Sequence, residues 1–258
     1  LYLHEVDAVI AAMEQTRYPT RNKAIALLLF CQCLQPSELC WLRWSDLDLA
    51  SKTLYIIRNR ELKSGTQHKQ INLQTLCPAE VQLLQQLALM RRCDWLFATE
   101  RQTRLNQRSL HYIIAESGKI ANLTFPIHPY MLRRSGLFLR AALLLKPLHL
   151  SLQQCCLLWN WHGTKVKLSK QQEREMRAIG EATSQAFLAV LTQMQSFTRI
   201  QSYDNLIDYL LGAFLLFPHL DSLPSDYWLA PIDRQRQLYR KDLSTIPASS
   251  TLSPSAMS

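Results

Sequence analysis

Glycine is scarce in this 258-residue sequence, where it occurs only 6 times. A collagen-like triple helix needs glycine at every third position, so that class is excluded. The seven cysteines include no Cys-x-x-Cys pair, which argues against a disulfide scaffold and favours reduced, mostly buried thiols. Long apolar runs are also missing, because the most apolar stretches, residues 24–30 and 206–217, are too short to span a bilayer. With 48% hydrophobic residues, the chain has the composition of a globular protein.

Positive charge is unevenly distributed along the chain, whose formal net charge is +9. Residues 1–170 contain 22 Lys and Arg against 11 Asp and Glu, a net charge of +11. Residues 171–258 contain 7 against 9, a net charge of −2. A basic segment of this kind is typical of a domain that meets phosphate, while the rest of the chain does something else.

Apolar residues recur at helical spacing through most of the chain. The pattern predicts helices over residues 3–16, 21–33, 37–42, 78–92, 106–121, 130–145, 150–159, 169–197, 203–217 and 226–242. Residues 53–58 and 69–73 have strand composition, and the turn signal Lys63-Ser64-Gly65 lies between them. The sequence therefore predicts a small hairpin or three-stranded sheet among many helices.

This order of elements predicts a mainly α-helical α+β fold with appended C-terminal helices. We expect one domain over residues 1–170 and a helical extension over 171–243, because the charge changes sign near residue 170. The tail, residues 244–258, is rich in Ser, Pro and Thr and is expected to be disordered.

Three motifs with a definite order and spacing lie within residues 3–170. The first is Cys33-Leu-Gln-Pro-Ser-Glu-Leu-Cys-Trp-Leu, the second Lys63-x-Gly65, and the third Phe125-Pro-Ile-His-Pro-Tyr-Met-Leu-Arg-Arg-Ser. This arrangement resembles the catalytic domain of the tyrosine recombinases, the phage integrase family. The corresponding family motifs read Gly-Leu-Arg-x-Ser-Glu-Leu-x-x-Leu and His-Pro-His-x-Leu-Arg-His. Within the family, the chain looks most like compact integrases related to fimbrial-switch recombinases.

The resemblance implies a particular chemistry on DNA. In the family, a tyrosine hydroxyl attacks a phosphodiester and forms a 3′-phosphotyrosyl link. Two arginines grip the non-bridging oxygens of the phosphate. A hairpin lysine acts as general acid, and two histidines, the second sometimes tryptophan, assist proton transfer and positioning.

Only part of this constellation is present when each position is carried over. The retained positions are Arg133, for the second arginine, and Lys63, for the hairpin lysine. The positions that differ are the first arginine, the first histidine, the second histidine and the nucleophile, which fall on Gln35, Tyr130, Leu158 and Lys167. We expect Lys63, Lys69, Arg133 and Arg134 to contact DNA, and we expect no metal and no cofactor.

Several alternatives stay open around these positions. Trp159, Trp161 or His162 could fill the second-histidine position if a turn shifts. Tyr130 could act as a relocated nucleophile, although it begins the helix that carries Arg133. A zinc site from Cys155, Cys156 and His162 is conceivable, but adjacent cysteines rarely match the spacing of zinc ligands.

The main hypothesis is a catalytically inactive, DNA-binding member of the tyrosine recombinase family. It would act in, or derive from, DNA recombination and integration on a mobile element. Expected partners are double-stranded DNA, an active recombinase or transposition complex, or a second copy through the C-terminal helices. Many members clamp DNA with a further N-terminal domain, so we expect modest, salt-sensitive affinity here.

Two other classes of function stay open. One is a protein–protein interaction scaffold that uses the recombinase fold and its C-terminal helices. The other is an active recombinase with relocated residues. The sequence shows no signal peptide and no membrane segment, so we expect a cytoplasmic, nucleoid-associated protein.

Overall fold

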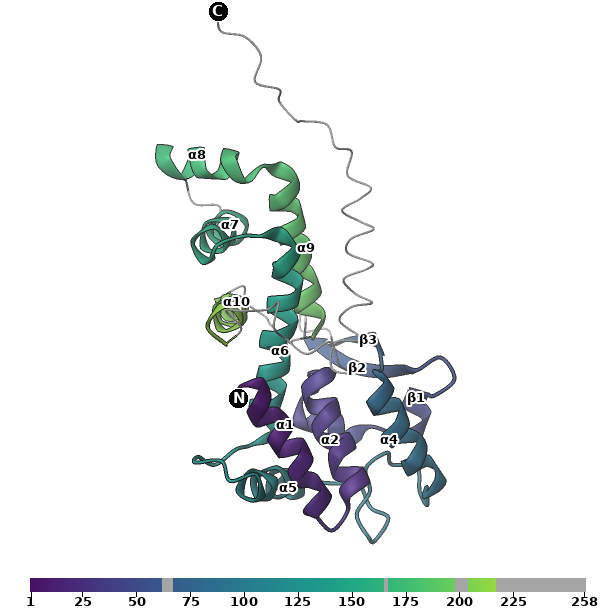
Figure 1. The fold of residues 1–258 in the computed structure, drawn as a ribbon. Helices are drawn as coiled ribbons and strands as arrows, with labels where there is room; N and C mark the ends of the chain where they lie inside the picture. The colour runs from purple at the N-terminus through teal and green to yellow at the C-terminus, as the bar shows by residue number, and fades with distance from the viewer. Residues whose placement is uncertain (62–66, 165–166, 198–203, 217–258) are drawn as a thin grey trace, which may run out of the picture.

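The fold is described from a computed structural model, over residues 1–61, 67–164, 167–197 and 204–216 (Figure 1). The longer helices are α1 (Leu3–Ala12), α2 (Pro19–Cys31), α4 (Pro78–Leu89), α5 (Gln107–Ile120), α6 (Pro129–Leu145), α7 (Leu152–Thr164), α8 (Lys170–Ile179), α9 (Glu181–Phe197) and α10 (Asp204–Leu216). Shorter elements are α3 (Pro36–Trp41) and the 3₁₀ turns η1 (Met13–Gln15), η2 (Trp44–Asp46) and η3 (Lys146–Leu148). The strands are β1 (Leu47–Asp48), β2 (Thr53–Glu61) and β3 (Gln67–Thr75). The prediction of a mainly helical α+β fold is confirmed.

The three strands form one antiparallel sheet in the order β1-β2-β3. Strand β2 pairs with β3 from Thr53 opposite Thr75 to Glu61 opposite Gln67. Leu54 and Ile56 alternate along β2 and are buried against the helices. The predicted sheet is confirmed, while the predicted turn at Lys63 to Gly65 lies outside the described residues.

Helix α2 is the central element of the fold and packs between α1, α4 and α6 (Figure 1). Its apolar run is buried from Ala24 to Cys31, as expected for a helix surrounded by others. Gly136 allows α6 to approach it closely. A Cβ atom there would lie 1.9 Å from the Phe30 carbonyl oxygen, so any larger residue would force the two helices apart.

The C-terminal helices differ from the prediction in one respect. One continuous helix over residues 169–197 is wrong, because the chain breaks at Gly180 between α8 and α9. Gly180 has φ +83, a backbone conformation that L side chains rarely adopt. Helix propensity alone does not reveal such a break, since a single glycine costs only about 1 kcal/mol in a helix.

Helices α9 and α10 pack against α6 rather than forming a core of their own. Phe187 and Leu191 of α9 and Leu210 of α10 are buried in the same hydrophobic cluster as α2. Gly212 lets α10 approach α6, since a Cβ there would lie 2.4 Å from the Phe138 ring. The division of the chain at residue 170 stays a prediction.

Among the described residues, no single helix has the length and apolar character needed to cross a membrane. The segments Pro129–Leu148 and Leu152–His162 meet that criterion only jointly, and they are bent by 97° with respect to each other.

Candidate functional site

Gln35 lies in the turn that joins α2 to α3, and its side chain is half-buried. Pro36 starts α3, which suits proline because the first helical N–H has no partner inside the helix. The Gln35 backbone N–H donates to Glu38 Oε2 at 2.7 Å, so the Glu38 carboxylate in the first turn of α3 stabilises the turn before the helix. Cys33, two residues earlier, has φ +51, in the left-handed region that non-glycine residues rarely adopt. The turn is therefore held by local hydrogen bonding at the position where the family motif has arginine.

Arg133 lies on α6 beside this turn and is only 8% exposed. Its Nε donates to the Cys33 carbonyl oxygen at 3.0 Å, and its Nη2 donates to the Phe197 carbonyl oxygen at 3.4 Å. The structure therefore brings Arg133 to the turn that contains Gln35. The backbone carbonyls of Cys33 and Phe197 fix the guanidinium of Arg133. The sequence pattern did not reveal these two contacts.

Arg140, two turns further along α6, shares one of these neighbours. Its guanidinium donates to the Cys31 carbonyl oxygen and lies 4.2 Å from the centre of the Phe197 ring. The last residue of α9 thus meets one arginine through its carbonyl and the other through its ring. The C-terminal end of α9 therefore packs against the face of α6 that carries Arg133 and Arg140.

Tyr130 lies in the first turn of α6 and is 46% exposed. Its ring is 6.3 Å from that of His128, which in turn lies 6.4 Å from that of His111 on α5. The motif comparison did not single out either histidine, although His128 stands directly before the Pro of the third motif. Arg134, also on α6, is exposed and lies 5.7 Å over the Phe138 ring. These side chains offer a polar, accessible surface at the start of α6.

Leu158 and Lys167, the residues predicted at the positions of the second histidine and the nucleophile, lie on and beside other helices. Leu158 is fully buried within α7, and Lys167 is exposed just before α8. Figure 1 shows α7 and α8 at the end of α6 opposite to its N-terminal turn. His162 on α7 is engaged with Ser184 on α9, at 3.0 Å between Nε2 and Oγ. The structure therefore places Leu158 on α7 and Lys167 just before α8, while Arg133 lies on α6 against the turn between α2 and α3.

The two lysines of the hairpin are only partly placed by the structure. Lys63 lies outside the described residues. Lys69 is on β3, where it pairs with Asn59 of β2, and only its backbone is described. Their expected contact with DNA stays a prediction.

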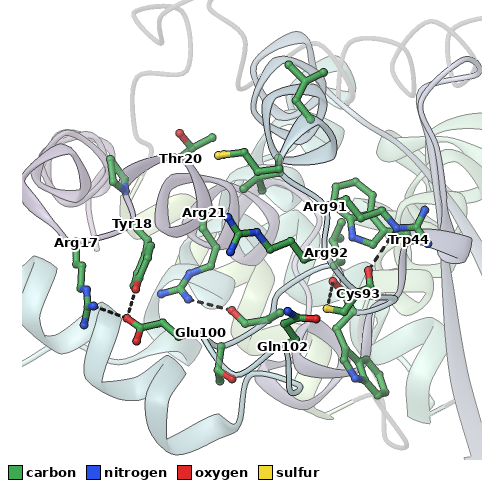
Figure 2. A pocket seen from close by; sticks show the side chains of 18 residues that line it. Arg17, Tyr18, Thr20, Arg21, Trp44, Arg91, Arg92, Cys93, Glu100 and Gln102 are labelled. Carbon is green, nitrogen blue, oxygen red and sulfur yellow. Dashed lines mark hydrogen bonds and ion pairs between the residues drawn. The ribbon is translucent and has the colours of Figure 1, made fainter.

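A second basic feature, which sequence reasoning missed, lies at the opposite end of α2. A pocket of about 740 Å³ opens between residues 17–21 and residues 87–102 (Figure 2). We call it the arginine pocket, because four arginines line it together with aromatic side chains: Arg17, Arg21, Arg91, Arg92, Tyr18, Trp44 and Trp95. The signal available in the sequence was the pair of arginines at residues 91 and 92, but nothing linked it to residues 17–21.

Hydrogen bonds and ring contacts hold most of the arginine pocket's walls in place. Arg17 pairs with Glu100 at 2.6 Å, and Arg21 donates to the Ala98 carbonyl oxygen at 3.0 Å. Tyr18 donates to Glu100, and this hydrogen bond lowers the pKa of the Glu100 carboxyl and raises the pKa of Tyr18. Figure 2 shows Arg92 extending into the pocket toward Arg21. Two cationic side chains that converge in this way suit an anion such as a phosphate.

Arginine side chains also stack on tryptophan rings around this pocket. Arg91 lies 5.8 Å from the centre of the Trp44 ring, and Arg43 lies 4.5 Å from that of Trp95. Contacts of this type hold guanidinium groups in place while leaving N–H donors available. The surface is therefore both basic and ordered.

Metal-ligand geometry occurs at one place among the described residues. The ligand atoms of Cys31, Cys77 and Glu80 all lie within 4.8 Å of one another. The alternative of Cys155, Cys156 and His162 does not form such a group in the described part of the chain.

Comparison with known proteins identifies the family. The sequence profile of the phage integrase family matches residues 1–138, and the chain belongs to that family. It is 34% identical over 139 residues to the type 1 fimbriae regulatory protein FimB of Escherichia coli K12, a match that covers 51% of this chain and 65% of FimB. It is 29% identical over 140 residues to the tyrosine recombinase XerC of Bacillus pumilus, covering 52% of this chain and 46% of XerC. The chain thus matches less than two thirds of either relative.

A solved structure supports the fold independently. The crystal structure of XerA recombinase superimposes with a TM-score of 0.51 at 18% sequence identity, covering 94% of this chain and 64% of that chain. The predicted tyrosine recombinase catalytic fold is therefore confirmed. The resemblance based on the three motifs is confirmed at the level of the family.

Proposed function

We propose that this chain is a DNA-binding protein of the tyrosine recombinase family that does not cleave DNA. It would act in, or derive from, DNA recombination and integration on a mobile element. The observation that carries the proposal is the separation described above. Arg133, at the predicted position of the second family arginine, is hydrogen-bonded to the turn between α2 and α3. Leu158 and Lys167, at the predicted positions of the second histidine and the nucleophile, lie on α7 and just before α8.

The chemistry of the substituted residues supports the absence of cleavage. An amine at Lys167 cannot form the phosphotyrosyl ester that the family reaction passes through. Gln35 can donate a neutral hydrogen bond but supplies no charge to a phosphate, where arginine gives a bidentate, charged contact. Members of a catalytic constellation act as a unit, so the missing nucleophile alone is enough to stop the covalent route.

The basic surfaces support DNA binding. Arg133 uses two of its N–H groups for backbone carbonyls, and no partner is found for Nη1 within the residues that the structure describes. A guanidinium so fixed has donors left for a phosphate. The arginine pocket adds converging cations at the far end of α2. Double-stranded DNA is the polyanion that this family membership favours.

Two assays test the proposal separately. Gel shifts with a mixed-sequence duplex over a series of salt concentrations measure the association constant. Its base-10 logarithm should fall by about 0.9 per phosphate contact for each tenfold rise in salt concentration. A suicide substrate that traps a 3′-phosphotyrosyl adduct should give none. Failure to bind at low salt would refute the first half, and a covalent adduct would refute the second.

A scaffold for another protein is the second candidate function. Leu215 on α10 is 75% exposed and Leu152 on α7 is also exposed, so the C-terminal helices present apolar side chains to solvent. Such side chains could bind an active recombinase, a transposition complex or a second copy of the chain. Light scattering of the pure protein distinguishes binding to a second copy of the chain from binding to an active recombinase or a transposition complex. Under either candidate, a cytoplasmic, nucleoid-associated location is proposed.

A further inference from the structure

A thiol–carboxyl cluster is buried where α2 and α4 meet. Cys31 ends α2, Cys77 stands directly before α4, and Glu80 lies in the first turn of α4. All three side chains are buried, and their ligand atoms lie within 4.8 Å of one another. Two sulfur ligands at about 2.3 Å from a tetrahedral zinc ion lie about 3.8 Å apart, a separation that fits within this limit.

One oxygen of Glu80 is available to a ligand. Its Oε2 accepts hydrogen bonds from the Cys77 backbone N–H and from Gln32 Nε2, both at 2.7 Å. Its Oε1 is buried and has no hydrogen-bond partner among the described residues. Natural proteins rarely leave a buried carboxyl oxygen unpaired, so this atom points to a positive group that would pair with it.

A second unpaired oxygen belongs to Gln32, whose amide nitrogen contacts Glu80. Gln32 donates through Nε2 to Glu80 and also to the Thr75 carbonyl oxygen at 3.2 Å. Its Oε1 is buried without a partner among the residues the structure describes. The amide is therefore held against Glu80 with its acceptor unused.

One arginine of α6 lies close to the cluster. Arg140 lies near, but its guanidinium is bound to the Cys31 carbonyl oxygen and to the Phe197 ring. No cationic side chain is found to pair with the Glu80 carboxylate in the described part of the chain.

We propose that Cys31, Cys77 and Glu80 form a structural zinc site, with the Gln32 Oε1 as the fourth ligand or its outer partner. Two thiolates and a carboxylate suit zinc and exclude magnesium and calcium, which take oxygen ligands. Binding forms two Zn–S bonds and one Zn–O bond, and it releases the thiol protons of Cys31 and Cys77 and any proton on Glu80.

Zinc at this place would join the end of α2 to the start of α4. The site lies directly before the turn of residues 32–35, whose Cys33 carbonyl receives Arg133. A zinc ion would therefore stiffen the backbone that positions both Gln35 and Arg133. The inference does not depend on whether the chain binds or cleaves DNA.

The test uses the full chain, reduced and stripped with a chelator. Titration with zinc against a chromophoric competitor should give one equivalent per chain. Cobalt in place of zinc should give a thiolate-to-metal charge-transfer band in the near ultraviolet. Cys77→Ala and Glu80→Gln should remove stoichiometric binding, and Gln32→Leu should weaken it by about 10- to 100-fold, as for outer partners of metal sites.

Cys155→Ala is the matched control, because Cys155 is also a buried thiol but lies on α7, outside the cluster. It should bind zinc and cobalt like the unaltered chain. Glu80→Gln keeps the shape of the side chain, so circular dichroism of this variant separates loss of metal from loss of fold. Binding retained in Cys77→Ala would overturn the proposal, as would the absence of a cobalt–thiolate band.

Discussion

The two ends of α2 use arginine in opposite ways. At the C-terminal end, Arg133 is buried and held by two backbone carbonyls. At the N-terminal end, Arg17 and Arg91 line the arginine pocket and pair with the exposed carboxylates of Glu100 and Asp94. A buried guanidinium depends on the fold for its position and stabilises the fold in return. Exposed ion pairs contribute little to stability and leave the arginines free to respond to a polyanion and to salt.

The strongest test of this difference is Arg133→Ala. It would leave the Cys33 and Phe197 carbonyl oxygens without their donor, so we expect the free energy of unfolding to fall by about 2–5 kcal/mol. Urea denaturation measures the loss. Arg134→Ala, on the exposed side of α6, is the control and should change stability by less than about 0.5 kcal/mol. Equal effects of the two variants would contradict the structural role of Arg133.

Gly136→Ala tests the packing beneath the buried end. The added Cβ would meet the Phe30 carbonyl oxygen at 1.9 Å, so α6 must shift away from α2. We expect a loss of about 1–3 kcal/mol, the usual range for overpacking. Thermal unfolding measures it, and an unchanged midpoint would show that α6 and α2 are not this close.

The arginine pocket is tested by the double variant Arg91→Ala, Arg92→Ala. We expect DNA affinity to fall roughly uniformly across sequences, and the salt slope to fall by about 1 for each phosphate that the variant no longer binds. Stability should change by less than about 0.5 kcal/mol, because both side chains are exposed. Arg174→Ala on α8, also exposed, is the control and should leave the salt slope unchanged. A slope that is the same in all three proteins would exclude the pocket from the DNA interface.

Tyr130→Phe should have the smallest effect. Its ring is nearly half exposed, so the loss of the hydroxyl should cost less than about 0.5 kcal/mol. If Tyr130 is no nucleophile, the suicide substrate traps no adduct with either protein. An adduct with the unaltered chain that disappears in Tyr130→Phe would identify a relocated nucleophile.

Helices and the hairpin were predictable because their signals are local. The apolar run of α2 and the β-branched residues of β2 each lie within a dozen neighbouring residues. The break at Gly180 was missed, since one glycine barely alters the helical pattern. The contact of Arg133 with the Cys33 carbonyl oxygen joins two of the family motifs that lie about a hundred residues apart in the sequence.

Features made by distant segments were not predictable in this way. The arginine pocket joins residues 17–21 to residues 87–102, and the thiol–carboxyl cluster joins Cys31 to Cys77. No periodicity in the chain relates such positions, because tertiary packing alone brings them together. The hydrogen bond from Arg133 to the Phe197 carbonyl oxygen was likewise not predictable from the motifs. Helix α9 lies beyond residues 1–138, which the family profile matches.

Phe197 couples the C-terminal helices to the rest of the fold. Its carbonyl binds Arg133 and its ring covers Arg140, so these two arginines of α6 are anchored by the last residue of α9. Substitutions at these three positions are not independent, and a lineage without α9 would expose two guanidinium groups at once. Among relatives with the same C-terminal helices, an aromatic residue at the end of α9 should covary with arginine at the position of Arg140.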